Sequence, residues 1–350
     1  MRDDHQVEVK PLTPHRAFAV HEPSQVGEVR RTAAALAESV GFDAVAAGRV
    51  ALIATELGTN LVKHAQGGQL LLAPVQGEDG RTLVELLSLD NGPGISNVAR
   101  SMADGYSTTG TLGGGLGAVQ RQAQEFDLYS RVPEGTVILA RVGPTTSPFG
   151  GGRTNAAVEV GAVVVCAPGE TVCGDAWTLK LEGLQASLMV VDGLGHGPVA
   201  GEAAMSAVAA FADQVPGSPA AMIERLHQAL RSTRGAAVAI AEADLQSRRI
   251  LYAGAGNIAG RLLSGHEDRS LLSQHGTVGL AVRRQQDMAY DWPAHALLLM
   301  HSDGITSRWH LDDDRALLQH HPSVVAGWVL RNHSRGRDDA TVVVLRVRGD

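Results

Sequence analysis

An apolar segment that stops at an Asp-Gly turn constrains the C-terminal half of this chain more than any other feature. Residues 188–191 are apolar and typical of a buried strand; residues 192–197 follow as Asp-Gly-Leu-Gly-His-Gly, and a helix is expected from Pro198. A strand, a glycine turn and a helix hold the carboxylate of Asp192 at the edge of a sheet. Taken alone, this turn fits a solvated loop residue equally well.

Further acidic turns repeat this design. Asp175 precedes a strand over 178–181, Asp303 follows a strand over 296–301, and Asp338 and Asp339 precede a strand over 342–347. Each one alone is better explained as a solvated turn, but together they predict oxygen ligands converging on Mg²⁺ or Mn²⁺. Two such ions can lower the pKa of a shared water and hold a phosphoryl group. Zinc is disfavoured, because no Cys or His pair has ligand spacing.

These motifs resemble the metal-dependent type 2C protein phosphatases, in the branch of SpoIIE, RsbU and RsbX. The resemblance covers residues 156–348 and includes Gly-Ala-Gly-Asn-Ile at 254–258 between the acidic turns. It implies a β-sandwich flanked by helices and assigns these roles: catalytic residues Asp192 and Asp303, and metal ligands Asp175, Asp192, the Gly193 carbonyl, Asp303 and Asp338. Asp339 is expected outside the two-metal core, at most near a third, weaker site. No arginine matches the phosphate-binding arginine of the eukaryotic relatives.

The N-terminal half has a different pattern. A helix predicted over 43–65 has Glu56 and Asn60 four residues apart, on one side, where a solvated pair is the simpler interpretation. A strand over 83–89 ends in Asp90, followed by Gly92 and Gly94. Beyond a polar segment at 104–110 with the composition of a mobile lid, three glycines, Gly113, Gly115 and Gly117, lead into a helix. Such a helix start favours phosphate but is weak evidence alone.

In this order, the three motifs resemble the GHKL (Bergerat) ATP-binding fold, an α/β sandwich, and within it the RsbT and RsbW type of serine/threonine kinase. The resemblance covers residues 20–143. It implies Glu56 as the base for the substrate hydroxyl and Asn60 as a ligand of the Mg²⁺ on ATP. It also implies an ATP site made of Asn60, Asp90, Gly92, Gly94, Gly113, Gly115, Gly117 and Thr136. His64 is expected to be a packed or surface histidine.

Length and composition are consistent with two domains. The chain has 350 residues, 44% of them hydrophobic and 19% charged, which argues against disorder. A Gly/Pro/Ser/Thr-rich linker at 144–155 predicts domains at 1–143 and 156–350. A net charge of −7 argues against nucleic acid or an anionic membrane as a partner. Two cysteines, no apolar leader and no run judged long and charge-free enough to span a bilayer favour the cytoplasm.

The combined expectation is an α+β chain that joins a kinase to a phosphatase. The families imply opposed reactions on Ser or Thr of STAS-domain anti-sigma-factor antagonists or stressosome-type proteins, with ATP and Mg²⁺ in the first domain and two Mg²⁺ or Mn²⁺ ions in the second. Alternatively, the first domain binds ATP and docks on a downstream effector without phosphorylating anything, or senses nucleotide for the phosphatase.

Overall fold

A computed structural model of the chain describes residues 7–9, 13–77, 80–102, 115–144, 157–213, 217–311 and 314–349. The chain divides into two compact units, each with its own hydrophobic core. His15–Asn155 forms one, here named the inserted unit. The other, the sandwich unit, combines Met1–Pro14 with Ala156–Asp350.

The short strand β1 (Val7–Val9) belongs to the sandwich unit. It pairs antiparallel with β8 (Asp175–Glu182), so that Val7 lies opposite Leu181. An edge strand presents unpaired N–H and C=O groups, and β1 pairs with those of β8. The sequence analysis expected residues 1–143 to form one domain, whereas in the structure this unit begins at His15.

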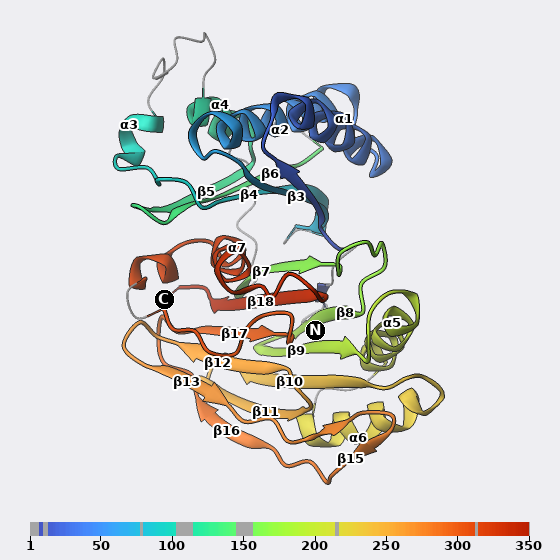
Figure 1. The fold of residues 1–350 in the computed structure, drawn as a ribbon. Coiled ribbons are helices and arrows are strands. Elements are labelled where there is room, and N and C mark those ends of the chain that lie inside the picture. Colours follow the sequence, from blue (N-terminus) through green and yellow to red (C-terminus); the bar gives the residue numbers. More distant parts are fainter. Residues whose placement is uncertain are drawn as a thin grey trace, which may run out of the picture. The chain divides into compact units, whose positions relative to one another are not determined.

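The inserted unit is an antiparallel sheet with helices α1 and α2 packed along it (Figure 1). The strand order is β2-β3-β4-β6-β5. In chain order the elements are β2 (Arg16–Val20), α1 (Pro23–Ser39), α2 (Ala44–His64), β3 (Gly68–Gln76), β4 (Thr82–Asp90), α3 (Val98–Met102), α4 (Gly115–Gln122), β5 (Glu125–Arg131) and β6 (Gly135–Val142).

Helix α2 is the central element of this unit. Its first turn is capped by Asp43, whose carboxylate accepts a hydrogen bond from Ala46 N at 2.8 Å. Its apolar face, including Ile53 and Leu57, is buried in the core against the sheet. Among the described helices, α2 alone is long and apolar enough to cross a membrane by length and composition. Almost half of its apolar window, 44%, is buried inside the protein, as in a core helix.

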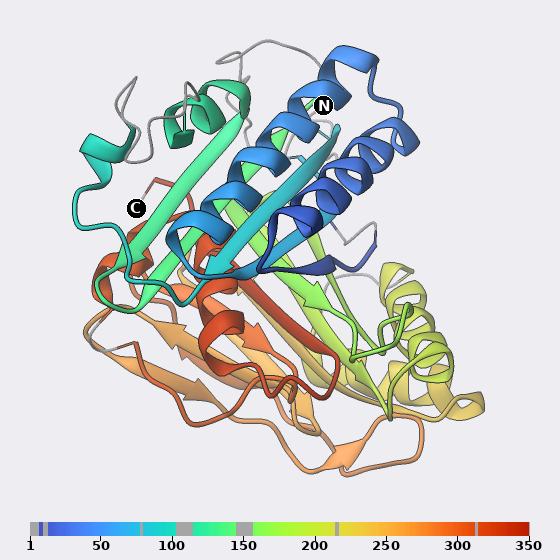
Figure 2. The ribbon, with the colours of Figure 1, turned by 45° about the horizontal axis from the view of Figure 1, so that its top comes forward.

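The sandwich unit consists of two antiparallel sheets (Figure 2). Their orders are β1-β8-β9-β10-β11-β16 and β13-β12-β17-β18-β7, with a small β14–β15 hairpin. The remaining strands are β7 (Val158–Val165), β9 (Gln185–Gly193), β10 (Ala236–Asp244), β11 (Arg249–Ala255), β12 (Ala259–Leu263), β13 (Asp268–Leu271), β14 (Gly276–Thr277), β15 (Ala281–Val282), β16 (Met288–Asp291), β17 (Leu297–His301) and β18 (Ala340–Val347).

Alternation along the strands builds two apolar layers in this unit. Leu188 and Val190 of β9 face Leu298 and Met300 of β17 in the core between the sheets. The opposite face of the first sheet packs against α5 (Pro198–Ala212) and α6 (Pro219–Ala229), and α7 (Pro322–His333) packs against β7 and β18. The predicted α+β class, an α/β sandwich followed by a β-sandwich flanked by helices, is confirmed.

Candidate functional site

Four predicted aspartates lie at the ends of strands in the sandwich unit. Asp175 begins β8 and lies opposite Asp192, near the end of β9, in the antiparallel register. Asp303 follows β17 and Asp338 precedes β18, and these strands pair so that His301 lies opposite Val342. The end of one antiparallel strand lies beside the start of its partner. The first sheet therefore brings Asp175 and Asp192 together at one edge, and the second sheet brings the residues after β17 and before β18 together at another.

A hydrogen bond links the two edges. Ser302, between β17 and Asp303, donates its hydroxyl to Asp175 Oδ2 at 2.6 Å. The other oxygen, Asp175 Oδ1, is buried and accepts no hydrogen bond from the residues that the structure describes. A buried carboxylate oxygen without a donor is costly unless a cation binds it.

The four aspartates Asp175, Asp192, Asp303 and Asp338 are called the carboxylate cluster, and its electrostatics favour a cation. Burial, followed by the charges of Asp175 and Asp303, raises the pKa of Asp192 to about 9. Burial also raises the pKa of Asp175 to about 7, reinforced by Asp339 and opposed by the hydrogen bond from Ser302. Divalent cations with oxygen ligands relieve this kind of repulsion, so the donor set fits Mg²⁺ or Mn²⁺.

The remaining predicted ligands are held by their neighbours. Asp303 Oδ2 accepts a hydrogen bond from Asn257 Nδ2 at 2.7 Å, which ties the Gly-Asn-Ile segment to the cluster. Asp338 Oδ1 accepts one from Asp339 N at 3.0 Å. Gly193 cannot have a side chain, because its Cβ would lie 2.2 Å from the carbonyl oxygen of Ala200.

Asp339 has different surroundings. Its Oδ1 accepts a hydrogen bond from Ala167 N at 2.7 Å, and its Oδ2 accepts one from Gly174 N at 2.9 Å. These bonds close the loop between β7 and β8, and they favour a structural role for Asp339. The same closure places Cys166 and Cys173 beside Asp339, with their ligand atoms within 4.8 Å of one another. The fold thus creates a cysteine pair that sequence spacing did not indicate.

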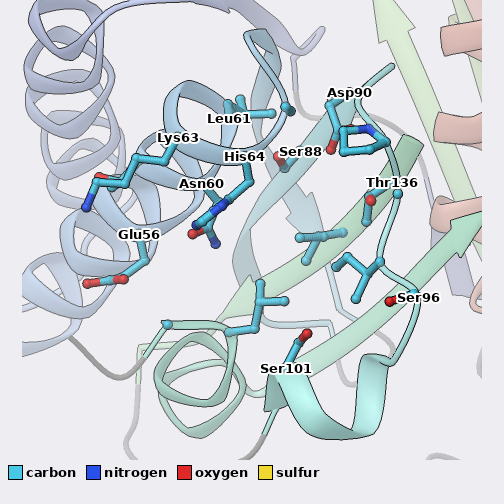
Figure 3. A pocket seen from close by; sticks show the side chains of 18 of the residues that line it. Glu56, Asn60, Leu61, Lys63, His64, Ser88, Asp90, Ser96, Ser101 and Thr136 are labelled. Carbon is cyan, nitrogen blue, oxygen red and sulfur yellow. The ribbon is translucent and has the colours of Figure 1, made fainter. Parts of the chain in front are cut away.

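The inserted unit has a cavity of about 520 Å³ beside α2. Figure 3 shows Glu56, Asn60 and His64 projecting from α2, while Asp90 and Thr136 come from strands. The predicted residues that line it are Glu56, Asn60, Asp90, Gly94, Gly115 and Thr136. Gly92 and Gly117 are not among the lining residues, and Gly113 and the segment 104–110 lie outside the described residues.

One wall of the cavity is the paired ends of β4 and β6. Asp90 lies opposite Thr136 in the register, and its Oδ1 accepts a hydrogen bond from Gly92 N at 2.8 Å. The hydroxyls of Thr136 and Ser130 are 2.9 Å apart, and Ser130 Oγ accepts a hydrogen bond from Ile95 N. These bonds fix a carboxylate and a hydroxyl side by side at the paired ends of β4 and β6.

The two glycines after Asp90 also have a purely structural cause. A Cβ on Gly92 would lie 2.8 Å from Ala65 Cα. Gly94 has φ of +72°, and a Cβ there would lie 2.6 Å from the carbonyl oxygen of Arg131. The chain after β4 therefore needs both glycines to pack, whatever lies in the cavity.

Several lining residues were not predicted: Thr59, Lys63, His64, Ser88, Ser96, Asn97, Arg100 and Ser101. Lys63 and His64 follow Asn60 by three and four residues, so helical periodicity could have placed them on the same side of α2. His64 is exposed, as expected for a surface histidine, but it also lines the cavity. Lys63 and Arg100 give the cavity cationic groups suited to phosphate.

Comparison with known proteins finds a family match in each of the two units. Residues 19–142 match the family of the histidine kinase-like ATPase domain, and residues 183–348 match the family of stage II sporulation protein E (SpoIIE). The chain is 37% identical to the serine/threonine-protein kinase RsbT of Bacillus subtilis (strain 168) over 105 residues, which are 30% of this chain and 78% of RsbT.

The second relative is the phosphoserine phosphatase RsbX of the same organism. It is 29% identical over 90 residues, which are 26% of this chain and only 45% of RsbX. Among solved structures, a chain from "The bacterial stressosome: a modular system that has been adapted to control secondary messenger signaling" is 30% identical, with a TM-score of 0.50, covering 54% of this chain and 99% of that one. The chain therefore belongs to the family of RsbT in its N-terminal half, and its C-terminal half matches the SpoIIE family model and is similar to RsbX.

Proposed function

We propose that this chain is a bifunctional switch in a partner-switching pathway, with a kinase in the inserted unit and an opposing phosphatase in the sandwich unit. The observation that supports this most directly is that one chain has both a cavity lined by Glu56, Asn60 and Asp90 and a separate carboxylate cluster around Asp175 and Asp192. Its homology to a kinase in one half and a phosphatase in the other supports the same pairing.

In the kinase reaction, ATP would occupy the cavity beside α2. Asp90, fixed opposite Thr136, would accept a hydrogen bond from the adenine amino group. Asn60 would hold the Mg²⁺ on the phosphates, with Gly115 at the start of α4 nearby. Glu56, one turn before Asn60, would accept the proton of the substrate hydroxyl as that oxygen attacks the γ-phosphorus and ADP leaves.

In the phosphatase reaction, Asp192 would lie between two divalent ions, with the Gly193 carbonyl, Asp303, Asp338 and Asp175 as further ligands. When bound, Mg²⁺ or Mn²⁺ ions supply an acidified water and positive charge for the phosphoryl oxygens. The buried oxygen of Asp175 and the raised pKa of Asp192 are the features of this chain that favour such ions. Ser302 and Asn257 would orient Asp175 and Asp303 through their hydrogen bonds.

The substrates would be Ser or Thr residues of STAS-domain antagonists or stressosome-type proteins in the cytoplasm. With both activities on one substrate, ATP would be consumed without net change unless a partner or nucleotide state biases one unit. We therefore infer that binding of a partner sets the ratio of the two rates. Equal rates of both reactions with every partner would contradict this regulation.

The competing function keeps the phosphatase and makes the inserted unit an ATP-dependent docking module for an effector. ATP binding requires only residues of the cavity wall, namely Asn60, Asp90 and Thr136. Phosphate transfer also requires Glu56 to act as a base. Glu56→Gln keeps the shape of the side chain and removes the base, and so separates the two functions.

The test measures each activity of the full-length protein on purified STAS-domain candidates. Glu56→Gln should abolish phosphate transfer and preserve ATP binding, while Glu28→Gln on the exposed side of α1 should change neither. Asp192→Ala should abolish phosphate release from the phosphorylated partner, while Asp291→Ala, at an exposed position, should not. ATP binding without transfer in the unmodified protein would favour the docking module.

A further inference from the structure

The chain segment before β10 lies against the turn that follows Asp192. Ala236, the first residue of β10, is opposite Gly193 in the register. One residue further along the turn, Leu194 N donates a hydrogen bond to Gly235 O at 3.0 Å. This contact places Arg234, the residue before Gly235, beside the turn that follows Asp192.

The guanidinium of Arg234 lies against Gly195, on the side where another residue would carry its side chain. Gly195 has φ of +95°, and its missing Cβ would be 3.2 Å from Arg234 Nη1, with no other heavy atom near. Thr233 fixes the backbone beneath Arg234, because its hydroxyl accepts a hydrogen bond from Gly235 N at 3.0 Å and donates one to Leu230 O at 2.8 Å. Arg234 is therefore presented by an ordered turn.

Arg234 is available for a ligand. Its side chain is exposed, and within the described part of the chain it forms no ion pair with a carboxylate. The nearby carboxylate cluster offers only acceptor oxygens, which repel a phosphate dianion. A guanidinium supplies several N–H donors in one plane and pairs with phosphate oxygens through two of them.

Exposed apolar side chains flank this arginine. Leu194, in the turn after Asp192, is 51% exposed, and Leu280 is 56% exposed. The Cγ atom of Leu280 is 3.1 Å from the position of a Cβ on Gly235, so Leu280 lies against the residue that follows Arg234. An exposed cation with exposed leucines on neighbouring segments is typical of a surface that binds another protein.

We propose that Arg234 binds the phosphate of the phosphorylated substrate segment, and that Leu194 and Leu280 contact apolar side chains on either side of the phosphorylated residue. This proposal rests on the phosphatase function proposed above. It assigns a phosphate-binding arginine that comes from the turn after α6, and it limits substrates to phosphorylated protein segments with apolar neighbours.

The test separates phosphate binding from turnover. Inorganic phosphate is titrated calorimetrically into the full-length protein with Mn²⁺, and KM and kcat are measured for p-nitrophenyl phosphate. Arg234→Ala should weaken phosphate binding and raise KM about tenfold, the loss expected for one charge-assisted contact. Arg234→Lys should restore part of the binding, and the matched control Arg231→Ala, exposed in the preceding turn, should change nothing.

The leucines are tested with a phosphorylated STAS-domain protein as substrate. Leu194→Ser and Leu280→Ser should raise KM for this protein and leave KM for p-nitrophenyl phosphate unchanged. The proposal is overturned if Arg234→Ala binds phosphate as well as Arg231→Ala does. It is also overturned if phosphate binding is lost only in Arg337→Ala, beside Asp338. Phosphate binding that depends on Arg234 without hydrolysis of either substrate would instead contradict the phosphatase function and keep the arginine site.

Discussion

Asp175 and Asp192 are direct cross-strand partners in the β8–β9 pair, so two carboxylates face one another at one edge of a buried sheet. Like charges in this position destabilise a sheet. Burial raises the pKa values of both groups, to about 7 for Asp175 and about 9 for Asp192, and the charge of Asp175 adds to the shift of Asp192. The metal-free fold therefore stores a repulsion that divalent cations would relieve.

The first prediction concerns the pH dependence of the metal-free protein. In the unfolded chain both carboxyls lose their protons near pH ~4, whereas in the fold they keep them to about pH 7 and about pH 9. The folded state binds more protons over this window, so its stability should decrease as pH rises from 5 to 9. All four tryptophans (Trp177, Trp292, Trp309 and Trp328) lie in the sandwich unit, so thermal unfolding followed by their fluorescence reports on this unit alone.

Adding Mg²⁺ or Mn²⁺ should raise the unfolding temperature of the sandwich unit by several degrees, most at the alkaline end. The variant Asp192→Asn should remove the part of the pH dependence between pH 7 and pH 9 and most of the metal effect. It should also make the metal-free sandwich unit more stable at pH 8. An unfolding temperature that rises with pH in the presence of a chelator would contradict the electrostatic account.

The neighbours Asp338 and Asp339 should respond differently to substitution by alanine. Asp339→Ala removes the acceptor for Ala167 N and Gly174 N, and should lower the free energy of unfolding by about 3 kcal/mol, the combined loss of two hydrogen bonds to a charged group. Asp338→Ala should leave stability nearly unchanged and weaken Mn²⁺ binding. Chemical denaturation measures the stability of both variants, and calorimetric titration measures their Mn²⁺ binding. Loss of stability in Asp338→Ala and loss of Mn²⁺ binding in Asp339→Ala would contradict the assigned roles.

Nucleotide binding by the inserted unit should depend on Asn60 and Asp90. Asp90→Asn keeps an acceptor for Gly92 N, so the fold should persist while adenine recognition is lost. Asn60→Ala should weaken binding at least tenfold when Mg²⁺ is present and have less effect when it is absent. A fluorescent ATP analogue measures both, with Glu28→Gln as the control. Unchanged affinity in both variants would place the nucleotide elsewhere.

The inserted unit should lose stability on acidification, unlike the metal-free sandwich unit. Burial alone would raise the pKa of Glu85, but Arg141 and His15 hold it at about 2. In the unfolded chain Glu85 binds a proton near pH ~4.3, so the fold binds fewer protons below that value and stability falls as pH decreases. Amide hydrogen exchange of β4 at pH 5 and pH 3 measures this, and Glu85→Gln should remove the difference.

The sequence was sufficient for elements with a strong local pattern. The apolar runs before Asp192 and Asp303 predict buried strands, and each run ends beside the start of an antiparallel partner, β8 for the first and β18 for the second. Helix α2 with Glu56 and Asn60 on one side follows from a period of 3.6 residues. These features depend on neighbours in the chain, which a sequence displays directly.

Features that depend on pairings across long distances in the chain could not be predicted. The pairing of β1 with β8 joins segments separated by the whole inserted unit, and a three-residue strand has little periodicity. The cysteine pair is created when Asp339 closes the loop between β7 and β8. Helix α7 was missed because it is apolar on most of its surface, and so lacks the amphipathic pattern that identifies a helix.

The most direct test of a bifunctional chain is the transfer of radiolabelled phosphate from ATP to a STAS-domain partner, comparing the unmodified protein with Asp192→Ala. The account predicts that label accumulates on the partner only when Asp192 is replaced, because the phosphatase otherwise removes it. No label with either protein, although ATP binds, would contradict the kinase function and leave the inserted unit as a nucleotide-dependent docking module.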